Sequence, residues 1–191
     1  MDEKQLIIDL QNGSESAFRN LVEVFQDKVY NTVVSIVQNN EEAEDISQEV
    51  FIEVYESVGK FRGESKLSTW IYRIATTKAL EAQRKKKASK RFAFLTSLFG
   101  ENDEIVHHPA TFEHPGVILE NKERANELFR HIAQLPDNQK VAFTLCNIEG
   151  LSYQEITEVM QISLSSVESL LFRAKSNLRK TLKDFYMTQD L

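Results

Sequence analysis

The sequence predicts an all-α protein made of two small helical domains joined by a flexible linker. Apolar residues recur at steps of three and four along most of the chain, as they do on one face of a helix. Only six glycines and three prolines occur in 191 residues, which is few for a fold rich in tight turns. A stretch without periodicity divides the chain into residues 1–92, a linker of residues 93–118, and residues 119–191.

The first domain is expected to contain three helices. Residues 16–38 and residues 41–58 repeat apolar side chains at helical spacing, and four acidic residues in the first turn of the second helix complement its dipole. A loop with two glycines follows. Ser65 or Ser68 is then expected to cap a third helix, which extends to about residue 87.

The second domain has a helix-turn-helix pattern near its end. Residues 119–135 resume helical periodicity, and Asp137 is expected to cap a helix that runs to about residue 148. An S-x-x-E capping box at residues 152–155 opens a short helix. After a three-residue turn, Ser163 is expected to cap the last helix, and in this motif the second helix usually enters the DNA major groove.

Charge is distributed very unevenly. Between Lys60 and Arg91 there are eleven basic residues and two acidic ones, a net charge of about +9, although the whole chain carries −6. Residues 1–58 hold thirteen acidic and three basic residues, a net charge of about −10. Because a phosphate backbone responds to the local field, the basic stretch favours nucleic-acid binding.

Two helices carry residues suited to nucleic acid. The last helix has small polar residues near its start and basic residues later, which suit base edges and phosphates. The basic helix follows a loop whose neighbourhood holds Phe61, Trp70 and Tyr72, and aromatic side chains beside cationic groups grip single strands. Both faces also fit the solvated surface of an ordinary helical bundle. The acidic helix of residues 41–58 fits either a solvated face or a surface for a basic helical partner.

Several classes of protein are not expected. The single cysteine, Cys146, allows no internal disulfide, and no signal peptide or long apolar run is present, so a cytoplasmic protein without membrane insertion is expected. His107, His108 and His114 lie in the linker without cysteines or carboxylates at ligand spacing, so neither a metal nor a cofactor is expected. No nucleophile, base and orienting group occur together, so no catalytic residue and no enzyme activity is expected.

Five segments together resemble a known family. Residues 44–51 (EDISQEVF), 61–65 (FRGES) and 69–75 (TWIYRIA) resemble the second domain of extracytoplasmic-function (ECF) RNA polymerase sigma factors of the sigma-70 family. Residues 150–156 (GLSYQEI) and 167–175 (VESLLFRAK) resemble the fourth domain of the same family. The resemblance implies that residues 1–92 are sigma domain two and residues 119–191 are sigma domain four.

The resemblance also implies a function, which is to bind core RNA polymerase and direct promoter-specific transcription initiation. The expected partners are the clamp helices of the largest polymerase subunit, the flap of the second-largest subunit, promoter DNA as duplex and as non-template single strand, and an anti-sigma factor. The residues implied to bind polymerase are Asp45, Gln48, Glu49 and Phe51. Those implied to bind the −10 element are Phe61, Arg62, Ser65, Trp70, Arg73, Thr77, Lys78, Arg84, Lys85, Lys86 and Lys87. Those implied to bind the −35 element are Ser165, Ser166, Glu168, Ser169, Phe172, Arg173, Lys175 and Arg179.

The sequence departs from the family pattern at two places in the −10 region. Thr76 and Thr77 stand where many members have Asn, and Ile71 stands where housekeeping relatives have a second Trp. The second departure predicts weaker DNA melting and a stricter dependence on promoter sequence. Two alternatives remain on the residues alone, a dimeric helix-turn-helix regulator that acts without polymerase, and a metal- or ligand-binding helical protein built on the histidine-rich linker.

Overall fold

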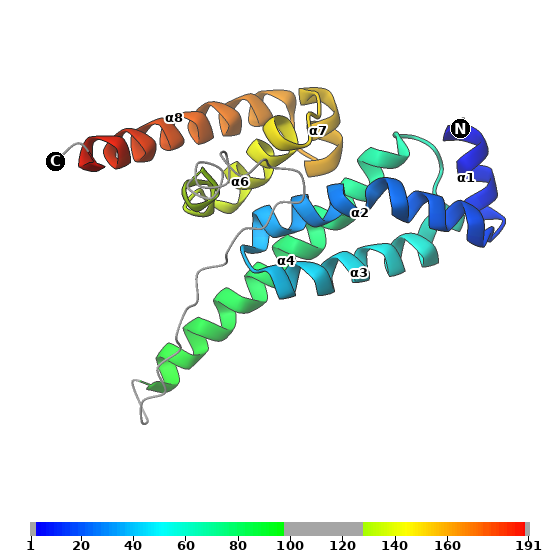
Figure 1. Ribbon diagram of the computed structural model, residues 1–191, viewed down its shortest axis with the longest axis horizontal. Coiled ribbons are helices and arrows are strands. Elements are labelled where there is room, and N and C mark those ends of the chain that lie inside the picture. Colours follow the sequence, from blue (N-terminus) through cyan, green and yellow to red (C-terminus); the bar gives the residue numbers. More distant parts are fainter. Residues whose placement is uncertain (1–2, 98–127, 190–191) are drawn as a thin grey trace.

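The computed structural model describes residues 3–97 and 128–189, and every regular element in these ranges is a helix. The expected all-α fold is therefore confirmed for the described chain. The first group of helices consists of α1 (Glu3–Gln11), α2 (Glu15–Val37), α3 (Asn40–Ser57), the short 3₁₀ helix η1 (Val58–Lys60) and α4 (Leu67–Ser97). The second group consists of a helical segment described over residues 128–133, α6 (Asp137–Phe143), the π-helical turn η2 (Thr144–Ile148), α7 (Tyr153–Met160) and α8 (Leu164–Gln189). Figure 1 shows both groups.

Helices α2, α3 and α4 enclose one apolar core. Leu21 and Val33 from α2, Val50 from α3, and Ile71 and Ala75 from α4 are fully buried, which is the result that their helical spacing predicts. Side-chain caps define the ends, because Ser14 accepts a hydrogen bond from Ala17 N–H and Asn39 accepts one from Glu42 N–H. The two expected helices at residues 16–38 and 41–58 are therefore present, with small shifts of their ends.

Helix α1 was not predicted from the sequence, because its nine residues bury only Leu10. Its Glu3 Oε1 accepts a 2.7 Å hydrogen bond from Leu67 N–H at the start of α4. The expectation that Ser65 or Ser68 caps α4 is wrong. The helix begins at Leu67, and the Ser65 hydroxyl instead donates to Lys66 O. The acceptor that this helix end requires is supplied by a distant carboxylate.

The second group contains the expected helix-turn-helix. The capping box is confirmed, since Ser152 Oγ accepts from Glu155 N–H and Glu155 Oε2 accepts from Ser152 N–H. Ser163 Oγ accepts from Ser166 N–H, so it caps α8 as expected. Asp137 does not cap α6, because Pro136 occupies the cap position and Asp137 is the first helical residue.

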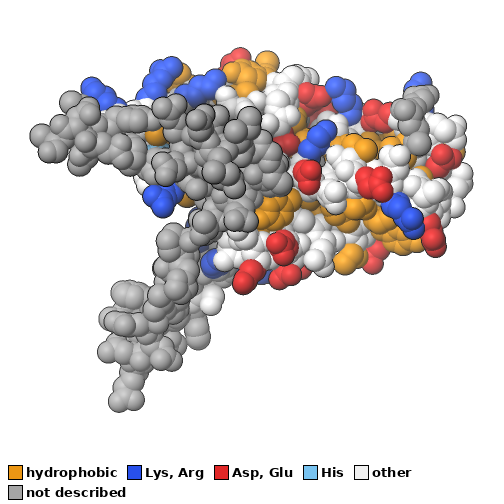
Figure 2. Space-filling view, in the orientation of Figure 1, with side chains coloured by type: hydrophobic (Ala, Val, Ile, Leu, Met, Phe, Trp, Pro, Cys, Tyr) orange, Lys and Arg blue, Asp and Glu red, His pale blue; other side chains and the backbone are white. Residues whose placement is uncertain are grey.

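The two groups pack against each other, with α4 beside α7 and with α2 beside α6 and η2 (Figure 1). Helix α4 continues to Ser97, about ten residues beyond the expected end of the third helix near residue 87. Most of the expected linker lies outside the described residues, as do His107, His108 and His114. On the face shown in Figure 2, Lys and Arg side chains gather over α8 and Asp and Glu side chains over α3.

Candidate nucleic-acid interface

Helix α8 presents a continuous polar face. Its buried side is formed by Val167, Leu171, Ala174 and Leu178, which recur at helical spacing. The residues expected to bind the −35 element are all exposed, namely Ser165, Ser166, Glu168, Ser169, Phe172, Arg173, Lys175 and Arg179. Phe172 is 75% exposed, although exposure of so large an apolar side chain is unfavourable in water. This face is therefore free of the core of its own domain.

The start of α8 is lined with small hydroxyl side chains. Ser163 Oγ lies 3.1 Å from Ser165 Oγ and 2.8 Å from Ser166 Oγ. A helix N-terminus with short polar side chains allows the backbone to approach a ligand closely and favours negative charge. Beyond it, Glu168 and Phe172 border a shallow hollow on the outer side of the helix.

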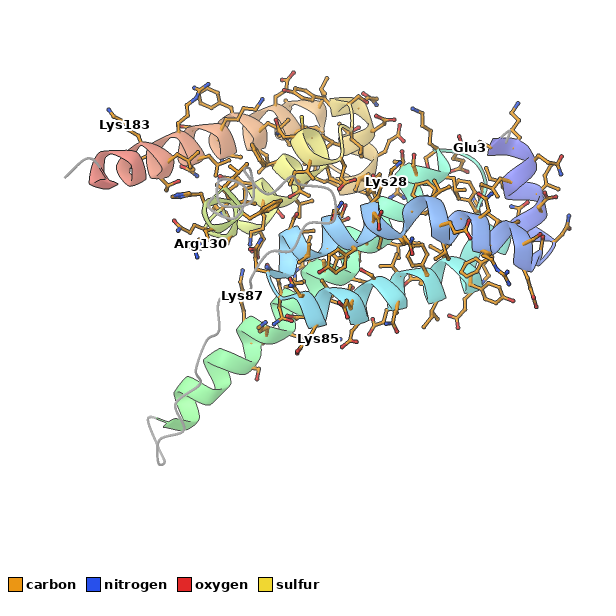
Figure 3. The ribbon with its side chains drawn as sticks, viewed as in Figure 1. Glu3, Lys28, Lys85, Lys87, Arg130 and Lys183 are labelled. Atoms are coloured by element: carbon orange, nitrogen blue, oxygen red, sulfur yellow. The ribbon has the colours of Figure 1, made fainter. Side chains whose placement is uncertain are left out.

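The four basic residues from Arg84 to Lys87 of α4 are exposed, and two of them have carboxylate partners. Lys86 Nζ lies 2.8 Å from Glu42 Oε2, and Lys87 Nζ lies 2.6 Å from Asp137 Oδ2 of the second group. Arg84 and Lys85 are also exposed. Figure 3 shows Lys85 and Lys87 on the same stretch of α4. Salt bridges at an exposed surface are weak, so a phosphate backbone can replace these partners.

Lys78 links the expected −10 surface to the expected polymerase-binding surface, which the sequence analysis described as separate sites. Its Nζ lies 3.0 Å from Glu53 Oε2 and 3.5 Å from Glu49 Oε2, both on α3. Lys78 is expected to bind the −10 element and Glu49 to bind polymerase. The structure therefore places the boundary between these two expected surfaces at the junction of α3 and α4.

The loop before α4 joins an aromatic pair to exposed charged residues. The rings of Phe61 and Trp70 lie 5.0 Å apart between centroids, and both are partly buried. Arg62 and Glu64 are highly exposed and form a loose 3.8 Å ion pair. Gly63 has a φ of 69°, which most other residues adopt only with strain. The expected −10 residues of the loop thus cluster at one end of α4.

Another expected −10 side chain, Arg73, faces the second group of helices. Its Nε and Nη2 donate to Glu158 O over 3.1 and 2.8 Å. The neighbouring Lys66, which was not among the expected −10 residues, has its Nζ 2.7 Å from Glu155 Oε1. Tyr72, which the sequence placed among the side chains able to hold bases, is only 4% exposed. That expectation is wrong for the packed form, because Tyr72 is enclosed by the contact between the two groups.

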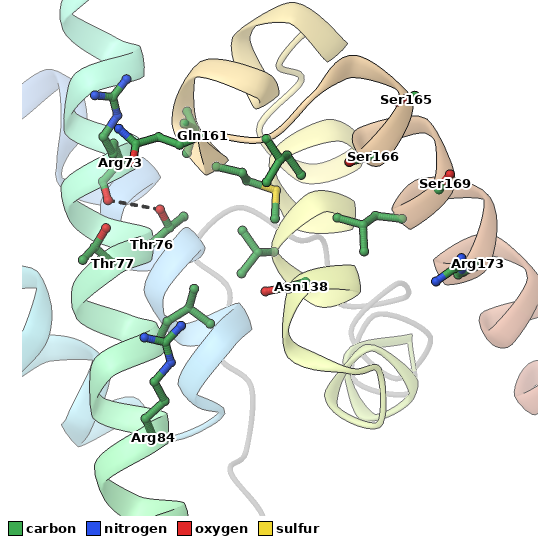
Figure 4. Close-up of a pocket in the computed structure, with 16 residues that line it drawn as sticks. Arg73, Thr76, Thr77, Arg84, Asn138, Gln161, Ser165, Ser166, Ser169 and Arg173 are labelled. Atoms are coloured by element: carbon green, nitrogen blue, oxygen red, sulfur yellow. Dashed lines mark hydrogen bonds between the residues drawn. The ribbon is translucent and has the colours of Figure 1, made fainter.

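A cleft separates α4 from the helix-turn-helix (Figure 4). Its volume is about 650 Å³, and Arg73, Arg84 and Arg173 lie along it. Clefts of this size accept small molecules. A DNA duplex is much larger, because its major groove alone is about 12 Å wide. Ser165 and Ser169 of α8 open into this cleft, so that side of α8 faces α4 while the groups are packed.

Burial and ion pairing shift the pKa of groups between α4 and the second group. Burial raises the pKa of the Glu149 carboxyl, and the Tyr72 hydroxyl and Lys28 offset this in part. Burial, with the neighbouring Glu149, raises the pKa of Tyr72, so its hydroxyl stays protonated. Hydrogen bonds from Lys66 and Ser152 lower the pKa of Glu155 to about 2.

The outer face of α3 carries apolar residues that the sequence analysis did not select. Ile52 and Tyr55 are 58% and 56% exposed. They continue the row formed by Asp45 and Gln48, which are exposed as expected, whereas Phe51 is partly buried against the core. The sequence could have revealed this row, because its residues from Asp45 to Tyr55 are spaced by three and four positions.

Two other kinds of site are absent from the described residues. No helix among them is long and apolar enough to cross a membrane. Within the same residues, no three histidine, cysteine or acidic side chains gather as a metal would require.

Comparison with known proteins identifies the family. Sigma-70 region 2 matches residues 21–89, and Sigma-70 region 4 matches residues 125–178. The chain is 35% identical to the RNA polymerase sigma-H factor of Pseudomonas aeruginosa over 95% of this chain and 94% of that protein. It is 32% identical to the ECF RNA polymerase sigma factor SigW of Bacillus subtilis over 95% of this chain and 97% of that protein.

Two solved structures share the fold. CnrH in complex with the cytosolic domain of CnrY has a TM-score of 0.69 and 18% identity, and covers 95% of this chain and 97% of that one. The sigma factor RpoE in complex with the anti-sigma factor NepR from Bartonella quintana has a TM-score of 0.66 and 18% identity, and covers 87% of this chain and 96% of that one. A dimeric helix-turn-helix regulator is not favoured, because it accounts for the second group of helices alone. The chain therefore belongs to the ECF RNA polymerase sigma factors of the sigma-70 family, which bind core polymerase and direct transcription initiation from promoters.

Proposed function

We propose that α8 reads the −35 element as duplex, while the Phe61–Lys66 loop and α4 hold the −10 element with its non-template strand unpaired. The observation that carries this proposal is the exposed face of α8, where all eight expected −35 residues lie free of the core. Phosphate contacts supply affinity that falls with salt, and base contacts supply sequence discrimination.

On α8, three neighbouring side chains have different base preferences. Arg173 suits the O6 and N7 acceptors of guanine, Glu168 accepts from the N4 amino group of cytosine, and Phe172 suits the methyl group of thymine. Lys175 and Arg179, one and two turns further along the exposed face, suit phosphates. The −35 sequence that this protein prefers is therefore set by its own side chains at these three positions, and it cannot be taken over from a relative.

At the −10 element, Phe61 and Trp70 offer an aromatic surface beside the cationic Arg62. Unstacking a base costs a few kcal/mol, which stacking on aromatic rings offsets. Exposed basic residues further along α4, from Arg84 to Lys87, are then suited to the strand backbone.

Docking on core polymerase is assigned to the outer face of α3. Asp45, Gln48 and Glu49 are exposed there beside Ile52 and Tyr55. A row of apolar side chains flanked by acidic ones fits a basic amphipathic coiled coil, such as the clamp helices of the largest subunit. We assign the contact with the flap of the second-largest subunit to the second group of helices.

The packed arrangement is incompatible with this promoter complex. Arg73 donates to Glu158 O, and the α4-facing side of α8 borders a cleft too small for a duplex. We infer that the two groups separate when the protein joins polymerase. The cleft is lined by both polar and apolar side chains and includes the cationic Arg84 and Arg173, so an acidic segment of an anti-sigma factor is suited to bind there and hold the protein inactive.

Run-off transcription with core polymerase and genomic fragments tests the proposal. The protein should direct transcripts from defined start sites, and alanine at Arg173 together with Lys175 should abolish most of them. A wild-type protein that co-elutes with core polymerase on a sizing column but yields no defined start on any template would refute the promoter assignments.

A further inference from the structure

Helix α1 holds both ends of the loop that precedes α4. Gln11 Nε2 donates a 2.9 Å hydrogen bond to Phe61 O where the loop begins. At the other end, Leu67 N–H donates a 2.7 Å hydrogen bond to Glu3 Oε1. One short helix therefore fixes the entry and the exit of a segment that lies about fifty residues or more away in the sequence.

The contact at the end of the loop meets a requirement of α4. The residue before the helix is Lys66, which has no side-chain acceptor for the first backbone N–H groups. These groups need acceptors, and the positive end of the helix dipole favours a carboxylate. The Glu3 carboxylate provides an acceptor for Leu67 N–H and a negative charge at this end of the helix, so the start of α4 depends on α1.

Within the loop itself, few interactions determine the conformation. Arg62 and Glu64 form only a loose pair at 3.8 Å between highly exposed side chains. Ser65 Oγ donates to Lys66 O at 3.4 Å, near the limit for a hydrogen bond. The two contacts from α1 are shorter than either. The loop is also tied to α7 by the 2.7 Å pair of Lys66 with Glu155, so the contacts from α1 become its main anchors once the two groups separate.

A hollow of about 800 Å³ lies between the loop, α1 and α7. Ile7 and Ile8 of α1 line one wall, and Ile8 is 48% exposed there. Glu155 and Glu158 line the opposite side. The loop and α1 form one side of this hollow, and that side remains beside the loop when the two groups separate.

We propose that Glu3 and Gln11 are positioning residues that hold the loop ready to capture an unpaired base of the −10 element. This inference rests on the proposed function, in which the loop binds that strand. A base leaves the duplex at a cost of a few kcal/mol. A loop that is already in place lowers the further cost of ordering it.

The test uses the full chain with core polymerase on two templates, a duplex promoter and the same promoter premelted over its −10 element. The key variant is Gln11→Ala. Its matched control is Gln5→Ala, because Gln5 lies on the same helix, is exposed, and donates to Asp9 within that helix. Loss of one hydrogen bond that acts at strand opening predicts about fivefold less transcript from the duplex. The premelted template should show little change, and the control should match wild type on both.

Glu3 is tested by two further variants. Glu3→Ala should repeat the selective loss on the duplex, whereas Glu3→Gln keeps an oxygen acceptor for Leu67 N–H and should restore most of the activity. Equal losses on both templates would mean that α1 only stabilises the fold, and Gln11→Ala behaving like Gln5→Ala would mean that the loop needs no such anchor. Either result overturns the inference. Absence of promoter-dependent transcripts with the wild-type chain on both templates would instead refute the proposed function.

Discussion

The Tyr72 hydroxyl, on α4, donates a 2.8 Å hydrogen bond to Glu149 Oε2, which follows η2 in the second group of helices. Tyr72 is buried and Glu149 is partly buried, so a carboxylate is enclosed where the two groups meet. Removing an ionised carboxylate from water is unfavourable unless it is well paired. Packing that encloses such a group is easier to undo than packing of apolar side chains alone, which suits the proposed separation of the two groups on polymerase.

Packing of the two groups should therefore weaken as pH rises. Burial raises the pKa of Glu149 in the packed form, so that form binds the proton more tightly than a separated form in which the carboxyl is solvated. Below the ordinary carboxyl pKa both forms are protonated, and above it ionisation favours separation. The radius of gyration from small-angle X-ray scattering should be larger at about pH 8 than at about pH 5.

Substitutions at the same contact provide the controls. Glu149→Gln removes the titrating group, so the difference between the two pH values should shrink. Tyr72→Phe removes the donor and should favour separation at both. The Lys66–Glu155 pair does not contribute, because the pKa of Glu155 is lowered to about 2 and the carboxylate is ionised throughout. A Glu149→Gln protein with the same pH response as wild type would contradict this assignment.

Salt dependence should distinguish the lysines of α4. Lys85→Ala removes one expected phosphate contact, so the log–log slope of holoenzyme binding to promoter against salt should fall by about 0.9. Arg19→Ala makes the same charge change at an exposed site near the start of α2 and should leave the slope unchanged. Filter binding or fluorescence anisotropy over a salt series measures both. An unchanged slope for Lys85→Ala would remove Lys85 from the interface.

Lys87 should behave differently from Lys85. Lys87→Ala also removes the 2.6 Å pair with Asp137, which joins α4 to the second group. Loss of that pair favours the separated form, so it offsets part of the lost phosphate contact. The net loss of promoter affinity should therefore be smaller than for Lys85→Ala, while the slope falls by a similar amount.

The local features of the fold followed from the sequence. The capping box at Ser152 and Glu155, the cap at Ser163 and the exposed face of α8 depend on residues close together in the chain, and periodicity reveals such relations. Helix α1 has a weak pattern because it buries little by itself. Its role appears only in contacts with residues about fifty or more positions away, Phe61 and Leu67.

The packing of the two groups of helices against each other could also not be predicted from the sequence. Polar pairs such as Tyr72 with Glu149 and Arg73 with Glu158 join separate helices, so no fixed separation in the sequence marks them. Ile71 also has a packing role, and the weaker DNA melting expected from it stays a prediction. Its side chain is fully buried in the first core, so an aromatic residue there would overfill the core before it affected DNA melting. The residue type at position 71 is therefore constrained by core packing, whatever its expected effect on promoter melting.

Phe172→Ala should separate DNA recognition from stability. The side chain is 75% exposed, so its loss removes little packing and the melting temperature should stay close to that of wild type. Preference for a promoter with its −35 element over one with that element scrambled should fall by about 1–3 kcal/mol, the usual contribution of a good base contact. Competition transcription with holoenzyme gives this ratio directly.

The control for Phe172→Ala is a phenylalanine in the core of the same group. Phe129 is 7% exposed, so Phe129→Ala should lower the free energy of unfolding by about 3–5 kcal/mol. Its effect on transcription should follow the fraction of folded protein and should not depend on the −35 sequence. If Phe172→Ala lowers the melting temperature as Phe129→Ala does, or if it leaves the −35 preference intact, then the exposed ring does not read DNA. The outer face of α8 would then have to be reassigned to a protein partner, since an exposed aromatic side chain beside Glu168 and Arg173 also suits a protein interface.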